Sequence, residues 1–200
     1  MNRHAIGKGA VIGIVAVVIV LVAAGVSYFV ITRPSSTSQT VPLVVGSYAQ
    51  YTGKVSAGIV SENETVRLQV VAINSTALEW IQSQTVGGQN SQSTYWVKAG
   101  ASPFHYSRAN DTFTPLKTSD TVRLIGSTTY SVTVAIYQQS GVNGTYTYYM
   151  LKSTSPIYAI IPLELSTQVT TTSSGNFTFT ASEDLYLTST NIAGLNTVQP

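Results

Sequence analysis

Residues Thr65 to Ile73 read TVRLQVVAI, and this stretch decides the predicted fold class. Val66, Leu68 and Val70 fall on one side of an extended chain, and polar residues separate them. Alternation with a period of two in a segment rich in β-branched residues is the pattern of a half-buried β-strand. The stretch therefore predicts a strand with one apolar face.

The same alternation recurs toward the C-terminus. It covers residues 130–137 and 176–181, and Leu185 and Leu187 continue it. Residues 157–165 are more uniformly apolar, which predicts a central strand, although Pro162 opposes full pairing there because proline has no N–H. No helical periodicity follows residue 31, so every predicted element in this part is a strand.

Turn residues separate these runs, and Asn-Gly between two strand patterns is the strongest hairpin signal. Strands spaced about every 8–12 residues are typical of an antiparallel β-sandwich. We predict an all-β domain over residues 43–200, a jelly-roll or immunoglobulin-like sandwich of about ten strands. The turn signals are Thr52-Gly53, Ser61–Glu64, Gly87–Asn90, Gly126-Ser127, Asn143-Gly144, Ser173–Asn176 and Ser182–Asp184.

Upstream, residues 10–31 read AVIGIVAVVIVLVAAGVSYFVI and contain neither charge nor proline. A helix of this length is about 33 Å long, enough to cross the hydrocarbon core of a bilayer. Residues 1–9 form a short basic leader, and residues 32–42, TRPSSTSQTVP, form a Ser/Thr-rich linker. The apolar segment predicts a single transmembrane α-helix in contact with membrane lipid. The excess of basic residues before this helix predicts a cytoplasmic N-terminus, and therefore an extracellular domain after the helix.

The pair Lys8-Gly9 directly precedes the apolar run at Ala10. This arrangement resembles the archaeal class III signal peptide, which prepilin peptidases cut after a basic-Gly pair. The resemblance covers about the first 40 residues and implies a processing site between Gly9 and Ala10 that leaves the hydrophobic helix on the mature protein. Such leaders occur on archaeal type IV pilins, archaellins and membrane-held solute-binding proteins. Ile14 stands where bacterial pilins usually have an acidic residue.

An ordinary secretory signal is the competing interpretation of the same segment. Small residues stand at suitable positions in Ala23-Ala24-Gly25 and in Gly25-Val26-Ser27. The apolar run continues past both positions to Ile31, which favours a retained helix over a removed signal.

Charged residues make up only 9% of the chain, and the part beyond residue 40 is nearly neutral. Nucleic-acid binding needs a clustered basic patch, so nucleic acid is not an expected partner. There are no cysteines, so packing and hydrogen bonds must supply the stability. With only eight carboxylates to neutralise, the charge changes little in acid, which hints at an acidic or harsh exterior.

Five Asn-x-Ser/Thr acceptor sequences follow the membrane segment, and the predicted topology exposes them to extracellular glycosylation. Four of them lie in or beside predicted turns, which favours modification of some. They are Asn63, Asn74, Asn110, Asn143 and Asn176.

Catalytic and metal-binding patterns are absent from the sequence. His105 is the only histidine beyond the apolar segment, and no nucleophile elbow, zinc motif or calcium loop accompanies it. The acidic pairs Glu62/Glu64 and Glu183/Asp184 fall in predicted turns, which favours solvated carboxylates. We therefore predict no enzymatic activity, no catalytic residue, no cofactor and no metal.

Aromatic residues on predicted strands are candidates for a contact surface. Tyr95, Trp96, Tyr146 and Tyr148 could bind a glycan or a second subunit, although alternate tyrosines in a sandwich more often pack on the core. The sequence thus predicts a membrane-anchored, glycosylated cell-surface module with a binding or structural role. The alternatives are a pilin-like filament subunit or adhesin, and an accessory ligand-binding domain of a transport or secretion system. The expected partners are itself, other surface proteins or a glycan.

Overall fold

The computed structural model describes residues 43–104, 113–139, 144–152, 157, 160–172 and 178–199. The leader, the apolar segment and the linker lie outside this part of the chain, so their predicted roles stay predictions. Within the described residues, no helix is long and apolar enough to cross a membrane.

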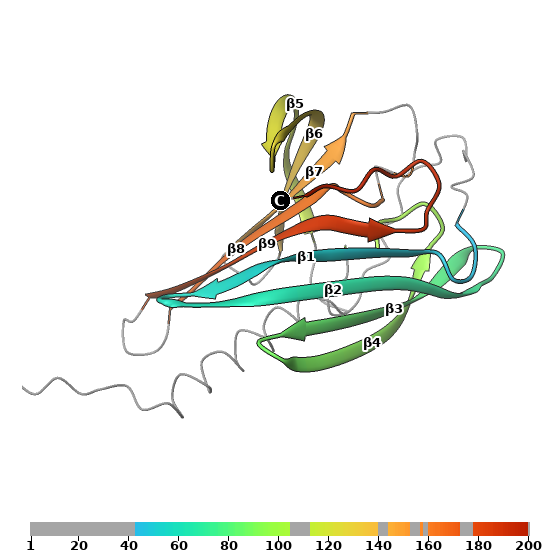
Figure 1. Cartoon of the computed structure of the whole chain (residues 1–200), viewed down its shortest axis with the longest axis horizontal. Coiled ribbons are helices and arrows are strands. Elements are labelled where there is room, and N and C mark those ends of the chain that lie inside the picture. The colour runs from blue at the N-terminus through green and yellow to red at the C-terminus, as the bar shows by residue number, and fades with distance from the viewer. Residues whose placement is uncertain are drawn as a thin grey trace, which may run out of the picture.

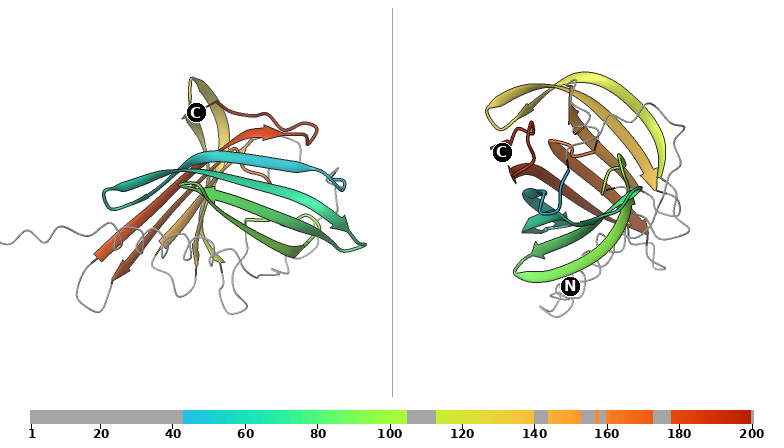
Figure 2. Two further views of the ribbon diagram at one scale, coloured as in Figure 1. Left: turned by 60° about the horizontal axis from the view of Figure 1, so that its bottom comes forward. Right: turned by 90° about the vertical axis from the view of Figure 1, so that its right-hand side faces the viewer.

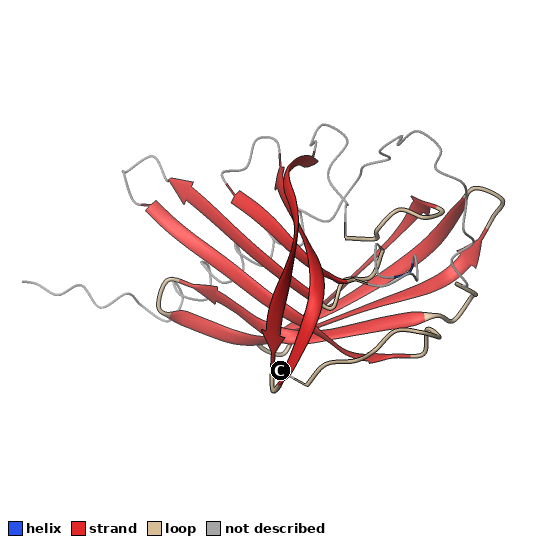
Figure 3. Cartoon of the chain, turned by 90° about the horizontal axis from the view of Figure 1, so that it is seen from above, coloured by secondary structure: helices blue, strands red, loops and turns tan. Residues whose placement is uncertain are grey.

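Nine antiparallel strands form one sheet in the order β4-β3-β2-β1-β9-β8-β7-β6-β5 (Figure 1). Figure 3 shows strands and loops, with no helix in the described residues. This confirms the prediction of an all-β, antiparallel domain. The strands are β1 (Tyr48–Ala57), β2 (Val60–Ile73), β3 (Ala77–Val86), β4 (Gln89–Lys98), β5 (Phe113–Ile125), β6 (Thr128–Gln139), β7 (Gly144–Leu151), β8 (Glu164–Thr172) and β9 (Thr178–Thr190).

Nearly every pair of bonded neighbours is consecutive in the sequence, and only β1 and β9 join distant segments. Two-residue loops at 58–59, 87–88 and 126–127 connect three of these pairs, and such short loops force their strands to be antiparallel neighbours. The order is therefore a meander, and it differs from the Greek-key order of a jelly roll or an immunoglobulin domain. Figure 2 shows that the sheet is strongly twisted and curved, with the β3–β4 and β5–β6 hairpins at its two ends.

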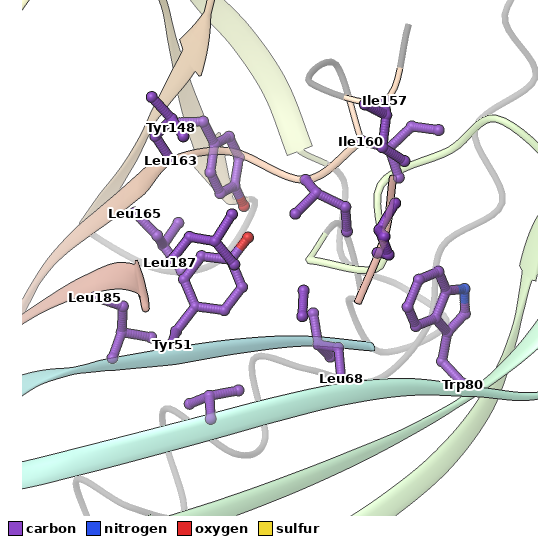
Figure 4. Packing of buried hydrophobic residues seen from close by; sticks show 14 of the residues in the cluster. Tyr51, Leu68, Trp80, Tyr148, Ile157, Ile160, Leu163, Leu165, Leu185 and Leu187 are labelled. Atoms are coloured by element: carbon purple, nitrogen blue, oxygen red, sulfur yellow. The ribbon is translucent and has the colours of Figure 1, made fainter. Parts of the chain in front are cut away.

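One hydrophobic cluster receives side chains from all nine strands. The alternation predicted for residues 65–73 is confirmed, because Val66, Leu68 and Val70 are buried in β2 and belong to this cluster. Figure 4 shows the centre of the cluster, where Tyr51, Leu68, Leu187 and Trp80 face the side chains of Ile157 and Ile160.

The uniformly apolar residues 157–165 were expected to form a central strand, and this prediction is wrong for most of them. Ile157 and Ile160 lie in turns, with the Ile160 N–H donating to the Ile157 carbonyl at 3.0 Å, and pairing as β8 begins only at Glu164. The segment packs its isoleucines into the core (Figure 4). Pro162 cannot donate to a ladder, and its carbonyl instead accepts a 2.8 Å hydrogen bond from the Tyr51 hydroxyl.

Tyr51→Phe tests this attachment. Tyr51 is fully buried, so removing its hydroxyl leaves the Pro162 carbonyl without that donor. We expect the variant to lose about 1–2 kcal/mol of unfolding free energy, as for a buried hydrogen bond whose acceptor loses its partner. Denaturant unfolding followed by fluorescence measures this loss. Tyr48→Phe, whose hydroxyl pairs with Ser189 in a partly buried setting, is the matched control with a smaller expected effect. Equal losses of unfolding free energy in the two variants would contradict a larger contribution from the buried Tyr51–Pro162 hydrogen bond.

The chain leaving β4 crosses toward the opposite edge of the sheet over this core. Ser102 donates a 2.7 Å hydrogen bond from Oγ to the Ile160 carbonyl. The ring of Phe104 meets the ring of Tyr51 edge-on, with centroids 5.0 Å apart. These contacts attach residues 99–104, which follow β4, to the segment that precedes β8. The described residues of both loops therefore contribute to the core.

Three predicted turns lie inside strands, and these predictions are wrong. Thr52-Gly53 falls within β1, Ser61–Glu64 within β2 and Ser182–Asp184 within β9. Polar residues and glycine suggested turns, but strand pairing on both sides overrides local preference. The turn predicted at 126–127 is confirmed, and the turn predicted at 87–90 is confirmed at 87–88 only, because β4 begins at Gln89. Asn143 and residues 173–176 lie outside the described part.

Candidate functional site

The four aromatic residues predicted to form a contact surface lie on β4 and β7, which five strands separate in the sheet. Tyr95 and Trp96 are neighbours in β4 and therefore point to opposite faces. Tyr95 packs against the core and donates to Gln82 Oε1 at 3.1 Å, whereas Trp96 is 46% exposed. Burial raises the pKa of Tyr95.

On β7, Tyr148 is buried and its hydroxyl donates to the Phe104 carbonyl at 3.4 Å. Its ring packs against that of Tyr137, with centroids 5.3 Å apart. Tyr146 lies two residues earlier in the same strand. The structure therefore does not gather Tyr95, Trp96 and Tyr148 on one surface, and of these three only Trp96 is substantially exposed.

Two of the five glycosylation sequences lie in the described residues, and both asparagines are exposed. Asn63 is in β2 rather than in the predicted turn. Asn74 lies between β2 and β3, where its Oδ1 accepts hydrogen bonds from the N–H and hydroxyl of Thr76 and from the N–H of Ala77. Glycan attachment uses the amide nitrogen, which these bonds do not involve. Asn110, Asn143 and Asn176, like His105 and the site at Gly9 and Ala10, lie outside the described residues.

Buried carboxyl groups are the feature that sequence reasoning missed. Glu64 and Glu183 were interpreted as solvated turn residues, and this is wrong, because they are 2% and 6% exposed. Glu64 pairs with Gly53 of β1, and Glu183 pairs with Val55 two residues further along that strand. The two glutamates thus flank β1 on the same side of the sheet. The sequence did carry a signal, because each glutamate keeps the period-two spacing of the buried apolar residues in its own strand.

We call this pair of glutamates the carboxyl layer, and the residues of other strands that hydrogen-bond to it are polar and uncharged. Gln84 donates its side-chain N–H to Glu64 Oε1, and buried Thr167 hydrogen-bonds Glu183. The layer lies between the main core and a small cluster of Val55, Ala57 and Val86. Neither Glu64 nor Glu183 has a Lys or Arg partner within 4 Å among the described residues.

Electrostatics in the carboxyl layer favours the protonated form. Burial raises the pKa of Glu64, and hydrogen bonding from Gln84 only partly opposes this. Burial also raises the pKa of Glu183 well above its ordinary value, and the neighbouring charge of Glu64 raises it further. Glu64 Oε2 is buried without a hydrogen-bond partner among the described residues, and a protonated Glu183 can supply one. The hydrogen bonds of the two carboxyl groups are therefore best satisfied in acid, where Glu183 is protonated.

A further buried carboxylate, that of Glu164, forms an ion pair with an arginine. Glu164, fully buried at the start of β8, accepts hydrogen bonds from Arg123 of β5, with Arg123 Nε at 2.9 Å from Oε2. The Arg123 guanidinium also lies 4.4 Å from the centroid of the Tyr149 ring. This bidentate pair ties the β5 edge to the middle of the sheet, which is a structural role.

No group of three or more His, Cys, Asp or Glu residues that could hold a metal ion occurs in the described part of the chain. Comparison of the chain with protein-family models, with curated proteins and with solved structures finds no match to any of them. Function must therefore be inferred from the physical properties of the described residues and from the sequence around them.

Proposed function

We propose that this chain is a membrane-anchored extracellular β-sheet protein with a binding or structural role at the cell surface. Residues 10–31 would hold it in the membrane, residues 32–42 would act as a spacer, and the two halves of the curved sheet would pack in a sandwich-like manner around their core. The exposure of both described glycosylation asparagines, Asn63 and Asn74, is the observation that carries this proposal. A glycan there would extend into solvent without disturbing the core.

The carboxyl layer supports an acidic exterior as the working environment. Buried carboxyl groups without cationic partners are least costly where they are protonated. Exposed serine, threonine, asparagine and glutamine keep the same charge over the whole acidic range. A protein with this combination retains its surface and its interior where many carboxylate-rich proteins would lose their ion pairs.

A pilin-like filament subunit is the second candidate, and one surface feature favours it. The edge strand β5 exposes Leu116, Val122 and Leu124, each more than half accessible. Exposed apolar side chains on an edge strand are suited to contact between subunits. In that case the apolar helix would pack inside the filament after cleavage at Gly9.

The N-terminal peptide and the acceptor peptides of the native protein test these proposals together. We expect mass spectrometry of membrane fractions to find an N-terminus at Met1 or Ala10 and glycan on Asn63 or Asn74. An Ala10 terminus in filaments sheared from the cells would favour the pilin-like subunit. A terminus near Val26 or Tyr28, with unmodified asparagines, would overturn the membrane anchor and the glycosylation alike.

A further inference from the structure

The carboxyl layer separates one end of the sheet from the main core. We call this end, which consists of residues 54–63 of β1 and β2, residues 84–88 at the end of β3 and residues 180–183 of β9, the distal end. It lies opposite the end of β1 at which the chain enters the sheet (Figure 1). The main cluster is far larger than the apolar cluster of the distal end, so hydrophobic burial holds this end weakly. The small cluster comprises Val55, Ala57 and Val86, with Ala181 packed against it.

The two glutamates of the carboxyl layer meet across β1. Glu64 of β2 pairs with Gly53, and Glu183 of β9 pairs with Val55. Their carboxyl groups are close enough to form a hydrogen bond to each other over β1. A carboxylate accepts hydrogen bonds but has none to donate, so this bond exists only while one of the two groups holds a proton. Loss of that proton replaces the bond by repulsion between two buried charges.

The other charged side chains near the pair do not compensate it. Lys54 of β1 pairs with Asp184 of β9, and both point to the opposite face of the sheet, because side chains alternate along a strand. Glu62 of β2 pairs with Val55 and adds a carboxyl group on the face that carries the layer. No positive charge among the described residues therefore replaces the shared proton. The side chains that hydrogen-bond the pair from β3 and β8 are the uncharged Gln84 and Thr167.

We propose that the two glutamates form an acid-operated latch on the distal end. When one of them is protonated, they tie β2 to β9 over β1. When both are ionised, the β1–β2 hairpin separates from β9 at residues 55–57 and 181–183, which pair in the closed sheet, while the main core stays folded. The opening is local because it uncovers only the small apolar cluster, and regions with little buried apolar surface open at the lowest free energy.

The direction of the pH dependence follows from proton binding. Burial raises the pKa of both carboxyl groups above the ordinary value of 4.5, and the open form exposes them to water. Above this pH the closed form therefore binds more protons than the open form, and opening becomes easier as the pH rises. For each proton released, the opening equilibrium shifts about tenfold toward the open form per pH unit.

This inference rests on the proposed acidic exterior, and it gives the carboxyl layer a role there. In a chain synthesised at near-neutral pH, the distal end would stay open. Acid outside the membrane would then protonate the pair and close the sheet. The layer would thus couple completion of the sheet to arrival at the cell surface.

Hydrogen–deuterium exchange of the full chain in detergent micelles tests the latch, with mass spectrometry from pH 4 to pH 7 and correction for the intrinsic exchange rate. We expect the protection of peptides from residues 54–63 and 180–183 to fall about tenfold per pH unit for each proton released, while peptides from residues 66–70 keep theirs. Glu183→Gln supplies an amide N–H that can donate to Glu64 at any pH, so this variant should keep the distal end protected at pH 7. Glu64→Gln supplies the same donor from β2 and should act in the same way, which keeps the test decisive if the first variant does not fold.

Glu62→Gln is the matched control, because it removes a carboxyl group from the same strand and face but leaves the bond between Glu64 and Glu183 in place. Four results would overturn the latch: equal protection of the distal peptides at pH 4 and pH 7, a joint loss of protection in the distal and core peptides, no gain in protection from either variant of the pair, or an equal gain from Glu62→Gln. None of these results depends on the N-terminus or on glycans. Failure of the latch would therefore leave the N-terminal peptide and the acceptor peptides unchanged.

Discussion

Gly53→Ala should destabilise this protein by about 4 kcal/mol or more, an exceptional loss for adding one methyl group. Gly53 lies in the middle of β1, where its neighbours are β2 on one side and β9 on the other. A Cβ atom at this position would lie 1.7 Å from the carbonyl oxygen of Asp184 and 3.0 Å from the Cα of Leu185. These are backbone atoms, so the overlap is relieved only if β1 moves away from β9.

The location of Gly53 makes this movement costly. β1 and β9 are the first and last strands, and their pairing is the only one in the described sheet that joins distant segments. Gly88→Ala is the matched control, because Gly88 has a φ of +84° but a Cβ atom added there would meet no described atom within 4 Å. Left-handed backbone strain alone predicts a loss of about 1–2 kcal/mol there. Denaturant unfolding measures the loss of unfolding free energy in both variants. Equal losses would contradict the predicted overlap between the added Cβ atom of Gly53→Ala and the β9 backbone.

Glu183→Gln should change the pH dependence of stability more than any other charge substitution in the described sheet. Both carboxyl groups of the carboxyl layer have pKa values raised above the ordinary value of about 4.5. Between this value and the raised pKa values, the folded protein binds more protons than the unfolded chain. The unfolding free energy is therefore highest below about pH 4.5 and falls as the pH rises through the raised pKa values.

The groups that hydrogen-bond the pair, act on its charge or lie opposite it come from four strands. Gln84 of β3 and Thr167 of β8 hydrogen-bond the carboxyl groups, the charge of Asp184 in β9 raises the pKa of Glu183, and Val55 of β1 lies opposite Glu183. No cation among the described residues pairs with either glutamate. Nothing in this set compensates a second negative charge, so ionisation at neutral pH opposes folding.

The neutral amide of Glu183→Gln should flatten the part of the stability profile that falls as the pH rises above about 4.5. At neutral pH the variant should be more stable than the natural chain, by about 1.4 kcal/mol for each pH unit over which the slope is lost. At pH 4 the two should be nearly equal. Thermal melts followed by circular dichroism across this range measure the difference. Glu79→Gln, which removes a carboxyl group at a partly exposed position on β3, is the control. A natural chain that becomes more stable from pH 5 to pH 7 would contradict the protonated pair.

Much of the fold follows from local sequence. The alternation of Val66, Leu68 and Val70 predicted both the existence of β2 and its buried face, since side chains on a strand alternate between faces. Glycines at 87–88 and 126 marked two hairpins correctly, because tight hairpins favour residues that tolerate positive φ. The mistakes at Gly53 and at Ser182–Asp184 have one cause: turn-forming residues also occur inside strands when neighbours hold them on both sides.

The candidate sites likewise include some features that the sequence predicted and others that only the structure shows. Sequence alone located the Asn-x-Ser/Thr motifs at Asn63 and Asn74, since such a motif is local, but it could not separate exposed Trp96 from buried Tyr148. Burial depends on which strands become neighbours, and a strand pattern does not contain that information. The carboxyl layer arises because β1 lies between β2 and β9, which brings Glu64 near a glutamate 119 positions later in the chain.

By itself, the sequence determined that this chain carries one long apolar segment followed by a strand-forming part with few charged residues and a nearly neutral net charge. Both properties depend on composition and short-range periodicity. The tertiary structure alone decided the meander order, the joining of β1 to β9 and the buried pair of carboxyl groups. These features result from contacts between residues far apart in the chain, and whether a strand lies in the centre or at the edge of a sheet is a property of the whole sheet.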